Sequence, residues 1–190
     1  MYVAIEGIDG CGKSTQVALL KEKYPGAIIT KEPGGTKLGE KLREILLFEN
    51  ISKKAELMLF LADRAEHFSK VIKPNLNKLV ISDRSFLSGI AYAMINKEFD
   101  INFLIKLNRF VLEDTLPQKL ILFEITKKEL IKRLSAKEQD SIEQRGIEYL
   151  MQIQKNLFEI ATSLKLDFLK IDASKDINTI HKQIVSYLKV

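Results

Sequence analysis

The sequence predicts an α/β fold with three layers, in which a five-stranded parallel sheet is covered by helices on both faces. Two observations lead to this prediction. Short apolar segments of strand-forming residues alternate with longer segments of helical periodicity along the whole chain. A glycine-rich segment, "GIDGCGKST" at residues 7–15, joins the first apolar segment to the first helix. Near-continuous apolar strands separated by helices are typical of a parallel sheet that is buried on both sides.

The five strands and the helices between them follow in a regular order. The strand segments are short and apolar, and they span residues 2–5, 27–30, 79–82, 120–125 and 168–171. Apolar residues at helical spacing predict helices over about residues 13–21, 38–48, 53–74, 86–96, 101–114, 127–134 and 142–163, and a closing helix follows the last strand. In such a sheet ligands bind beyond the carboxyl ends of the strands, so the residues that follow each strand are the candidates for a functional site.

The composition fits a single domain over residues 1–190. The chain is 46% hydrophobic and contains no segment that resembles a linker or a repeat. Its 30 basic and 25 acidic residues give a net charge of +5, which suits anionic ligands. The positive charge is spread along the chain, so we expect no nucleic-acid partner. No apolar run is long enough to span a bilayer and no leader precedes the first strand, so we expect no membrane association and a cytoplasmic protein.

The first strand leads into a phosphate-binding loop. Residues 7–14 match the pattern G-x-x-x-x-G-K-[ST], which is informative because it joins a strand to a helix. The glycines allow the backbone to curl with its N–H groups inward, and the helix directs its positive end toward the same space. Lys13 is then expected to contact the β and γ phosphates of a nucleoside triphosphate, and the Ser14 hydroxyl to bind Mg²⁺. The candidate nucleotide-binding residues of the loop are Gly7, Ile8, Asp9, Gly10, Cys11, Gly12, Lys13, Ser14 and Thr15.

Two further polar clusters follow the second and third strands. They are "TKEPGGT" at residues 30–36 and "SDRSFLSGIAYA" at residues 82–93. Because the carboxyl ends of parallel strands meet at one edge, we expect both clusters to converge on the phosphate loop. Asp83 directly follows a strand, which is the position of the magnesium-associated carboxylate in phosphate-loop proteins. Capping the next helix is an alternative role for Asp83, and both roles can hold together. The single cysteine, Cys11, cannot form an internal disulfide and is expected only to pack within the loop.

Four segments, taken in this order and spacing, resemble bacterial thymidylate kinases. They are "EGIDGCGKSTQ", "TKEPGGT", "LFLADRAEH" at residues 59–67 and "SDRSFLSGIAY", and the resemblance covers nearly the whole chain. The phosphate loop is widespread among proteins, whereas an E-P-G-G-T turn about twenty residues later is found almost only in this family. The resemblance implies the P-loop NTPase fold with a short lid at about residues 132–146. It also implies transfer of the γ-phosphoryl group of Mg-ATP to dTMP, with dTDP and ADP as products, by a protein that is commonly a homodimer.

The resemblance assigns roles to individual residues. The residues that correspond to catalytic residues of the family are Lys13, Asp9 and Arg84. Arg84 resembles the arginine that binds the acceptor phosphate with two hydrogen bonds. Arg43 is similar to a second such arginine. A phosphate monoester is mostly dianionic at neutral pH, so the attacking oxygen needs no general base. The protein has to bring two negative groups together, and its contribution is positioning and positive charge.

Other residues correspond to the recognition of base, sugar and metal. Phe60 resembles the aromatic ring that stacks on thymine, and Arg64, one helical turn later, resembles the arginine that hydrogen-bonds the base. Tyr92 is similar to the ring that occupies the space of a ribose 2′-hydroxyl group. The implied dTMP-binding residues are Asp9, Glu32, Pro33, Arg43, Phe60, Arg64, Arg84, Ser88 and Tyr92. The implied metal ligands are Ser14, Asp83 and Asp9.

The lid departs from the family pattern. Members of the family often carry an arginine in the phosphate loop or basic residues in the lid, but here the loop position is Gly10 and a common lid position is Ser141. Lys137 or Arg133 can replace this charge, and Arg133 is similar to the arginine that lies against the adenine ring of ATP. Asp140 and Glu143 match acidic lid residues whose roles the sequence does not fix.

Two other functions stay open at this point. The segment "DRS" at residues 83–85 is also similar to deoxynucleoside kinases, which phosphorylate a sugar hydroxyl group such as that of thymidine. Such a reaction needs a carboxylate base, which would be Asp83 or Glu6, but the E-P-G-G-T turn argues against it. The other alternative is a non-catalytic ATP-binding switch. A GTPase in particular is disfavoured, because neither N-K pair of the chain, at residues 77–78 and 96–97, is followed by the aspartate of an N-K-x-D motif.

Overall fold

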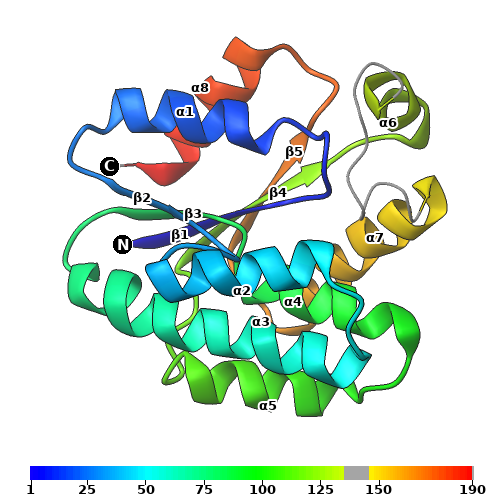
Figure 1. Ribbon diagram of the computed structural model, residues 1–190. Helices are drawn as coiled ribbons and strands as arrows, with labels where there is room; N and C mark the ends of the chain where they lie inside the picture. Colours follow the sequence, from blue (N-terminus) through cyan, green and yellow to red (C-terminus); the bar gives the residue numbers. More distant parts are fainter. Residues whose placement is uncertain (135–145, 190) are drawn as a thin grey trace.

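The computed structural model describes residues 1–134 and 146–189, in which five strands form one parallel sheet (Figure 1). The strands are β1 (Tyr2–Glu6), β2 (Ile28–Lys31), β3 (Val80–Asp83), β4 (Lys119–Glu124) and β5 (Phe168–Asp172). Their order across the sheet is β2-β3-β1-β4-β5, and all neighbouring pairs are parallel. The predicted five-stranded parallel sheet is therefore confirmed.

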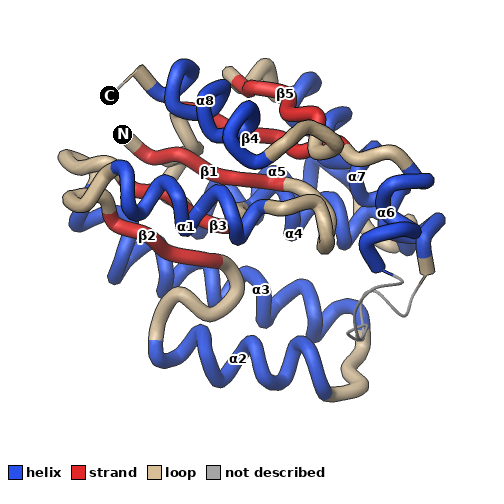
Figure 2. The backbone as a smooth tube through the Cα atoms, turned by 90° about the horizontal axis from the view of Figure 1, so that it is seen from above, coloured by secondary structure: helices blue, strands red, loops and turns tan. Residues whose placement is uncertain are grey.

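Helices cover both faces of the sheet and make the three predicted layers. The helices are α1 (Lys13–Lys23), α2 (Lys37–Phe48), α3 (Lys53–His67), α4 (Phe86–Ala93), α5 (Ile101–Val111), α6 (Lys127–Leu134), α7 (Ile147–Ser163) and α8 (Ile177–Leu188). Figure 1 shows α1 and α8 on one face of the sheet, with α3, α4, α5 and α7 on the other. Seen from above in Figure 2, α2 lies beyond the β2 edge of the sheet.

Three predicted helices end as α-helices earlier than predicted. Helix α4 ends at Ala93 and continues as a 3₁₀ turn to Asn96. The long segment predicted over residues 53–74 ends as an α-helix at His67 and continues as a π-helical turn and a 3₁₀ turn up to Asn75. Pro74 lacks a backbone N–H and its ring clashes with the preceding turn, so a regular helix cannot pass it. Helix α5 ends at Val111 rather than 114, since Glu113 and Asp114 have positive φ angles. The predicted start of the seventh helix, at 142, lies outside the described residues, within which α7 begins after Gly146.

The central strands are buried on both faces of the sheet, which explains why their sequences are continuously apolar. All five residues of β1 are buried, and the middle of β4 is buried as well, because helices cover both faces. The buried apolar side chains of the described residues form one continuous cluster. The single domain over residues 1–190 stays a prediction. Of the predicted lid, only residues 132–134 and 146 belong to the described ranges.

The register of the sheet brings the predicted polar clusters together. Asp83 at the end of β3 pairs in register with Ile5 of β1 and with Lys31 of β2. The segments that follow these three strands therefore begin at the same edge of the sheet, as the sequence predicts. Among the described residues, none of the helices has the length and apolar character that crossing a membrane requires.

Candidate active site

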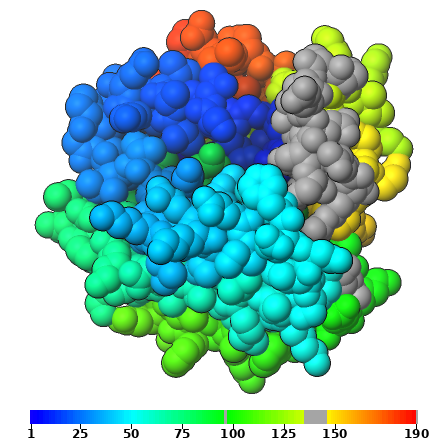
Figure 3. Space-filling model, in the orientation of Figure 1, coloured from blue at the N-terminus to red at the C-terminus, as the bar shows by residue number. Residues whose placement is uncertain are grey.

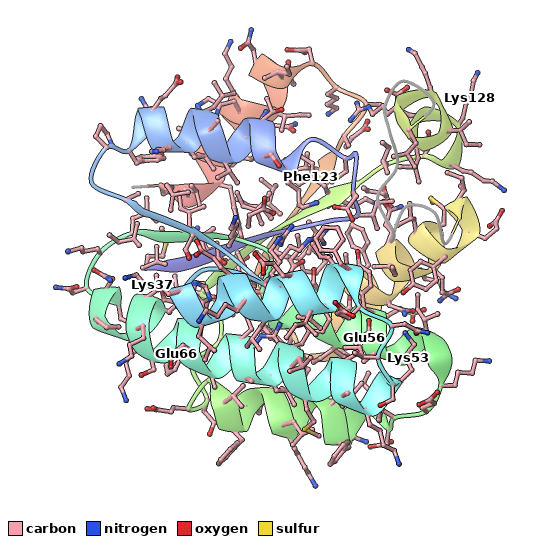
Figure 4. The ribbon with its side chains drawn as sticks, viewed as in Figure 1. Lys37, Lys53, Glu56, Glu66, Phe123 and Lys128 are labelled. Carbon is pink, nitrogen blue, oxygen red and sulfur yellow. The ribbon has the colours of Figure 1, made fainter. Side chains whose placement is uncertain are left out.

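The phosphate loop has the backbone conformation that its glycines allow. Gly7, Gly10 and Gly12 have φ angles of 150°, 78° and 99°. At Gly7 a Cβ atom would lie 2.8 Å from Cys11 Sγ and 2.9 Å from Cβ of Phe123, which Figure 4 labels. The loop thus folds closely onto β4, and any larger residue at position 7 would disrupt it. Cys11 is buried in this contact, and burial raises the pKa of its thiol, as expected for a residue that packs.

The start of α1 is left open to an anionic ligand. Helices α2, α3, α4, α5 and α8 each have an N-cap side chain that accepts a hydrogen bond from their first turn. The N-cap of α1 is Gly12, which supplies no such group. The Lys13 ammonium group is buried and donates to the Ile8 carbonyl oxygen, at 3.0 Å. Ser14 and Thr15 are exposed in the first turn. Free N–H groups at a helix N-terminus, beside a lysine, form an anion-binding site.

Arg84 joins the end of β3 to the phosphate loop. Its Nη2 atom donates to Asp9 Oδ1 at 2.6 Å, and Nη1 donates to the Gly7 carbonyl oxygen at 2.9 Å. The guanidinium also lies over the ring of Tyr92, 5.9 Å from its centroid. Burial disfavours the charge of Arg84, but the surrounding carboxylates, those of Asp9 and Glu6 among them, outweigh this and raise its pKa above the ordinary value. Arg84 is therefore a fixed cation at the centre of the site.

A cleft with about 740 Å³ of empty space, counting the part open to solvent, lies beside the phosphate loop. Figure 3 shows a hollow in the surface. The phosphate loop and α1, in dark blue, lie on one side of it, and α2, in light blue, lies on the other. The cleft contains every residue predicted from the resemblance to bind dTMP, namely Asp9, Glu32, Pro33, Arg43, Phe60, Arg64, Arg84, Ser88 and Tyr92. The sequence analysis missed five further lining residues, namely Leu46, Leu47, Glu56, Ser85 and Gly89. Figure 4 shows one of them, Glu56, beside its ion-pair partner Lys53 at the start of α3.

The inner wall of the cleft is a buried charge pair. Arg64 Nε donates to Glu32 Oε2 at 2.8 Å, and Arg64 Nη1 donates to Asn108 Oδ1 at 2.5 Å. Burial alone would raise the pKa of Glu32, but the positive charge of Arg64 and the hydrogen bond from His67 outweigh it and lower this pKa. These contacts hold the Arg64 guanidinium in one orientation. Asn108 and His67 were missed because nothing in their local sequence shows what they contact.

The E-P-G-G-T turn forms the wall near α2. Arg43 Nη1 donates to the Pro33 carbonyl oxygen at 3.0 Å. Gly34 has a φ angle of 99°, and a Cβ atom there would lie 3.0 Å from Cδ of Arg43. The backbone N–H of Gly34 donates to Asp63 Oδ1 at 3.0 Å, which fastens the turn to α3. The turn thus holds Arg43 at the cleft, which Arg84 also lines.

Glu6 organises the start of α4 without facing the cleft. Its Oε1 atom accepts hydrogen bonds from the backbone N–H and hydroxyl of Ser85, both at 2.7 Å, and its Oε2 atom accepts from the Ser88 hydroxyl. Glu6 is completely buried, and burial raises its pKa. Ser88 Oγ also accepts from Arg84 Nη1 at 3.1 Å, so Glu6 fixes Arg84 indirectly. With both oxygens occupied, Glu6 does not match the general base of a deoxynucleoside kinase.

The residues predicted to bind Mg²⁺ can supply only some of its ligands, and the nucleotide would have to supply others. Asp83 Oδ1 is buried and has no hydrogen-bond partner within the described ranges, which suits a cation or its bound water. The helix-capping alternative for Asp83 is not seen, because the N-cap of α4 is Ser85. The described residues contain no group of three or more acidic, His or Cys side chains that could hold a metal. Mg²⁺ is commonly bound by one or two carboxylates together with substrate phosphates and water, so this donor set fits the ion only alongside a nucleotide.

Arg133 lies beside the phosphate loop. Its Nη1 atom donates to the Gly10 carbonyl oxygen at 3.2 Å, and Nη2 donates to the Ala173 carbonyl oxygen at 2.6 Å. Its Nε atom pairs with Glu129 on the same helix. Arg133 therefore connects α6 to the loop and to the segment after β5. The other lid residues considered in the sequence, namely Lys137, Asp140, Ser141 and Glu143, lie outside the described residues.

Comparisons with known proteins agree with this geometry. A sequence profile of the thymidylate kinase family matches residues 5–184. The thymidylate kinase of Wolinella succinogenes is 56% identical over 187 residues, which cover 98% of this chain and 97% of that protein. The thymidylate kinase of Campylobacter hominis is 56% identical over the full length of both chains. The crystal structure of thymidylate kinase from Ehrlichia chaffeensis superposes with a TM-score of 0.76 at 31% identity, covering 100% of this chain and 98% of that one. The chain therefore belongs to the thymidylate kinase family and has its P-loop NTPase fold.

Proposed function

We propose that the cleft binds dTMP and the phosphate loop binds ATP, so that the protein transfers the γ-phosphoryl group of Mg-ATP to dTMP. The observation that carries this proposal is the position of Arg84. It lines the cleft and also hydrogen-bonds Gly7 and Asp9 of the phosphate loop. One fixed cation therefore faces both the donor loop and the acceptor cleft, which is where charge develops during phosphoryl transfer.

The proposed chemistry is charge neutralisation in a fixed geometry. The dTMP phosphate is largely dianionic near pH 7 and attacks the γ-phosphorus without a general base. Lys13 holds the transferring phosphates, while Arg84 and Arg43, which both line the cleft, hold the acceptor phosphate. Mg²⁺, bound with the nucleotide by Ser14 and Asp83, would reduce the charge on the phosphates. Asp9 orients Arg84 through their ion pair and lies near the sugar and the metal.

The proposed base and sugar contacts come from α3 and α4. Phe60 stacks on thymine, and Arg64 donates to the base from the orientation that Glu32 and Asn108 give it. The Tyr92 hydroxyl is buried without a hydrogen-bond partner in the described ranges, and burial raises its pKa, so it stays protonated. Its ring fills the space that a ribose 2′-hydroxyl group would need, which makes deoxyribose preferred.

Arg133 is a further cation beside the donor loop. It contacts the carbonyl oxygen of Gly10, the loop position that has no side chain of its own to offer. We therefore assign Arg133 to the ATP site, against the adenine ring.

A homodimer in the cytoplasm is also proposed. Met58 of α3 is 51% exposed, and Phe103 and Phe110 of the adjacent α5 are 45% and 81% exposed. Large apolar side chains exposed on two neighbouring helices suit a contact with a second copy of the chain. The one cysteine, Cys11, is free and buried, so the fold needs no oxidising compartment.

The test is ADP release with dTMP, dUMP, the ribonucleotide TMP and thymidine as alternative acceptors. We expect dTMP to exceed thymidine in kcat/KM by at least about 100-fold, since thymidine leaves the acceptor cations unpaired. Comparable rates with thymidine would instead indicate a deoxynucleoside kinase. ATP binding without acceptor-dependent ADP release would indicate a switch. Membership of the family favours neither outcome.

A further inference from the structure

The imidazole ring of His67, the last residue of α3, touches three parts of one segment, which runs from Thr30 to Gly35. Its Nε2 atom lies 2.6 Å from Thr30 Oγ1, and its Nδ1 atom lies 2.9 Å from Glu32 Oε1. A Cβ atom placed on Gly35 would lie only 2.5 Å from His67 Cδ2. The ring is 0% exposed. The end of β2 and the start of the E-P-G-G-T turn are therefore folded around this ring.

The two hydrogen bonds fix which way the ring faces. A carboxylate can only accept, so the proton on Nδ1 is donated to Glu32. The Thr30 hydroxyl can donate to Nε2 in return. Gly35 closes the edge of the ring between them, because no other residue would leave the ring enough space. A flipped or displaced ring would leave buried polar atoms unsatisfied, which is costly.

His67 reaches the acceptor cleft only through other residues. The carboxylate of Glu32 is shared, with Oε1 bound to His67 and Oε2 bound to Arg64. Glu32 and Arg64 line the cleft, whereas His67 does not. The turn that packs on the ring also carries Pro33, whose carbonyl oxygen binds Arg43. The orientations of Arg64 and Arg43 therefore depend on the segment at residues 30–35, which packs on the ring of His67.

We propose that His67 is a positioning residue of the acceptor site. It fixes Glu32 and the turn, and thereby gives Arg64 and Arg43 their orientation toward dTMP, without touching the substrate. This inference rests on the proposed function, because it takes the cleft to be the dTMP site. The hydrogen bonds of His67 go to Thr30 and Glu32 and its ring packs on Gly35, all on the acceptor side, so we expect the effect of losing the ring to be confined to the acceptor.

The test uses two substitutions that each keep one nitrogen position of the ring. Asparagine places its amide nitrogen near the position of Nδ1 and retains the bond to Glu32, whereas glutamine reaches the position of Nε2 and loses it. We expect His67→Gln to raise the KM for dTMP by about 10- to 100-fold, which is the loss of one hydrogen bond to a buried charged group. We expect His67→Asn to stay within about 3-fold of the wild type, because this bond is kept. The KM for ATP should be unchanged in both.

The other histidine, His181 on α8, supplies the matched control. His181→Gln should change neither KM. Thr30→Val removes the second hydrogen bond of the ring, so we expect a smaller rise in the KM for dTMP. This variant tests the proposal even if His67→Gln folds poorly. Thermal unfolding of each variant identifies those that are folded at the assay temperature.

Amide hydrogen exchange of residues 30–36 gives a readout that does not need activity. We expect faster exchange there in His67→Gln than in His67→Asn, starting at the Gly34 amide that binds Asp63. Equal exchange and an unchanged KM for dTMP in a folded His67→Gln variant would overturn the proposal. So would an equal rise in the KM for ATP, which would mean a general loss of stability. If the wild-type protein does not phosphorylate dTMP, the proposed function fails, while exchange still decides whether His67 holds the turn.

Discussion

Arg64 Nε lies 2.8 Å from Glu32 Oε2, and each of the two side chains is only 3% exposed. Burying two charges is costly, and their attraction repays this only where the geometry is good and the remaining polar atoms are bonded. Here His67, Asn108 and Ser85 bond those remaining atoms. The pair therefore serves orientation more than stability, and it puts a guanidinium of fixed direction at the wall of the cleft that we propose binds dTMP.

The stability lost on replacing Glu32 should depend on pH in a defined way. The pKa of Glu32 is lowered in the folded protein, so the stabilising effect of its charge is present above the unfolded pKa of about 4.3 and is lost as pH falls through the folded pKa. We expect Glu32→Gln to be less stable than the wild type by about 3–5 kcal/mol at pH 7, because Arg64 is left unpaired. The difference should shrink below about pH 4. Urea unfolding from pH 7 to pH 3 measures it.

The control for this prediction is Glu44→Gln, which changes an exposed carboxylate on α2. It should lie within about 0.5 kcal/mol of the wild type throughout. A stability gap for Glu32→Gln that stays constant across the pH range would contradict the assignment of a charged Glu32.

Removing Arg84 should damage catalysis more than folding. Arg84→Ala takes away the cation that joins the donor loop to the acceptor cleft, so we expect kcat/KM for dTMP to fall by about 10²- to 10³-fold. Arg109→Ala is the matched control, because Arg109 pairs with Asp114 at the surface, where its side chain is 46% exposed. The control should keep nearly full activity. Steady-state kinetics decides, and an Arg84→Ala enzyme with wild-type kinetics would rule out the proposed role.

Asp83 should control the metal requirement. We expect chelation with EDTA to stop ADP formation and added Mg²⁺ to restore it. Asp83→Asn keeps the size of the side chain but loses its charge, so the Mg²⁺ concentration for half-maximal rate should rise by about 10-fold or more. Titration of the rate with Mg²⁺ at saturating ATP measures this shift. An unchanged Mg²⁺ dependence would show that the buried Asp83 oxygen has another partner.

The proposed dimer can be tested on α5. Phe110→Ser removes an apolar side chain that is 81% exposed, so it should weaken self-association. Phe48→Ser is the control, since Phe48 is equally exposed but lies on α2. Analytical ultracentrifugation of the three proteins measures the mass in solution. The face made by α3 and α5 would be excluded as the dimer interface if the wild type were a monomer. It would also be excluded if only Phe48→Ser dissociated into monomers.

Much of the site followed from sequence because its residues come directly after strands. The positions after β1, β2 and β3 hold the loop, the E-P-G-G-T turn and Arg84, and parallel strands bring such positions to one edge. The cleft residues on α3 were identified differently. Phe60 and Arg64 stand one helical turn apart, which shows that they share a face, but only the resemblance to thymidylate kinases indicated that this face binds a nucleotide.

The chain by itself determined the sheet, the phosphate loop and the order of the polar segments, because strand periodicity and glycine spacing are local properties of the sequence. The tertiary structure alone decided which buried groups hold these segments in place. Glu6 bonds Ser85 across 79 positions, Arg64 bonds Asn108 across 44, and His67 bonds Glu32 across 35. Such hydrogen bonds depend on how helices pack on the sheet and on each other, and no local pattern of residues records that packing.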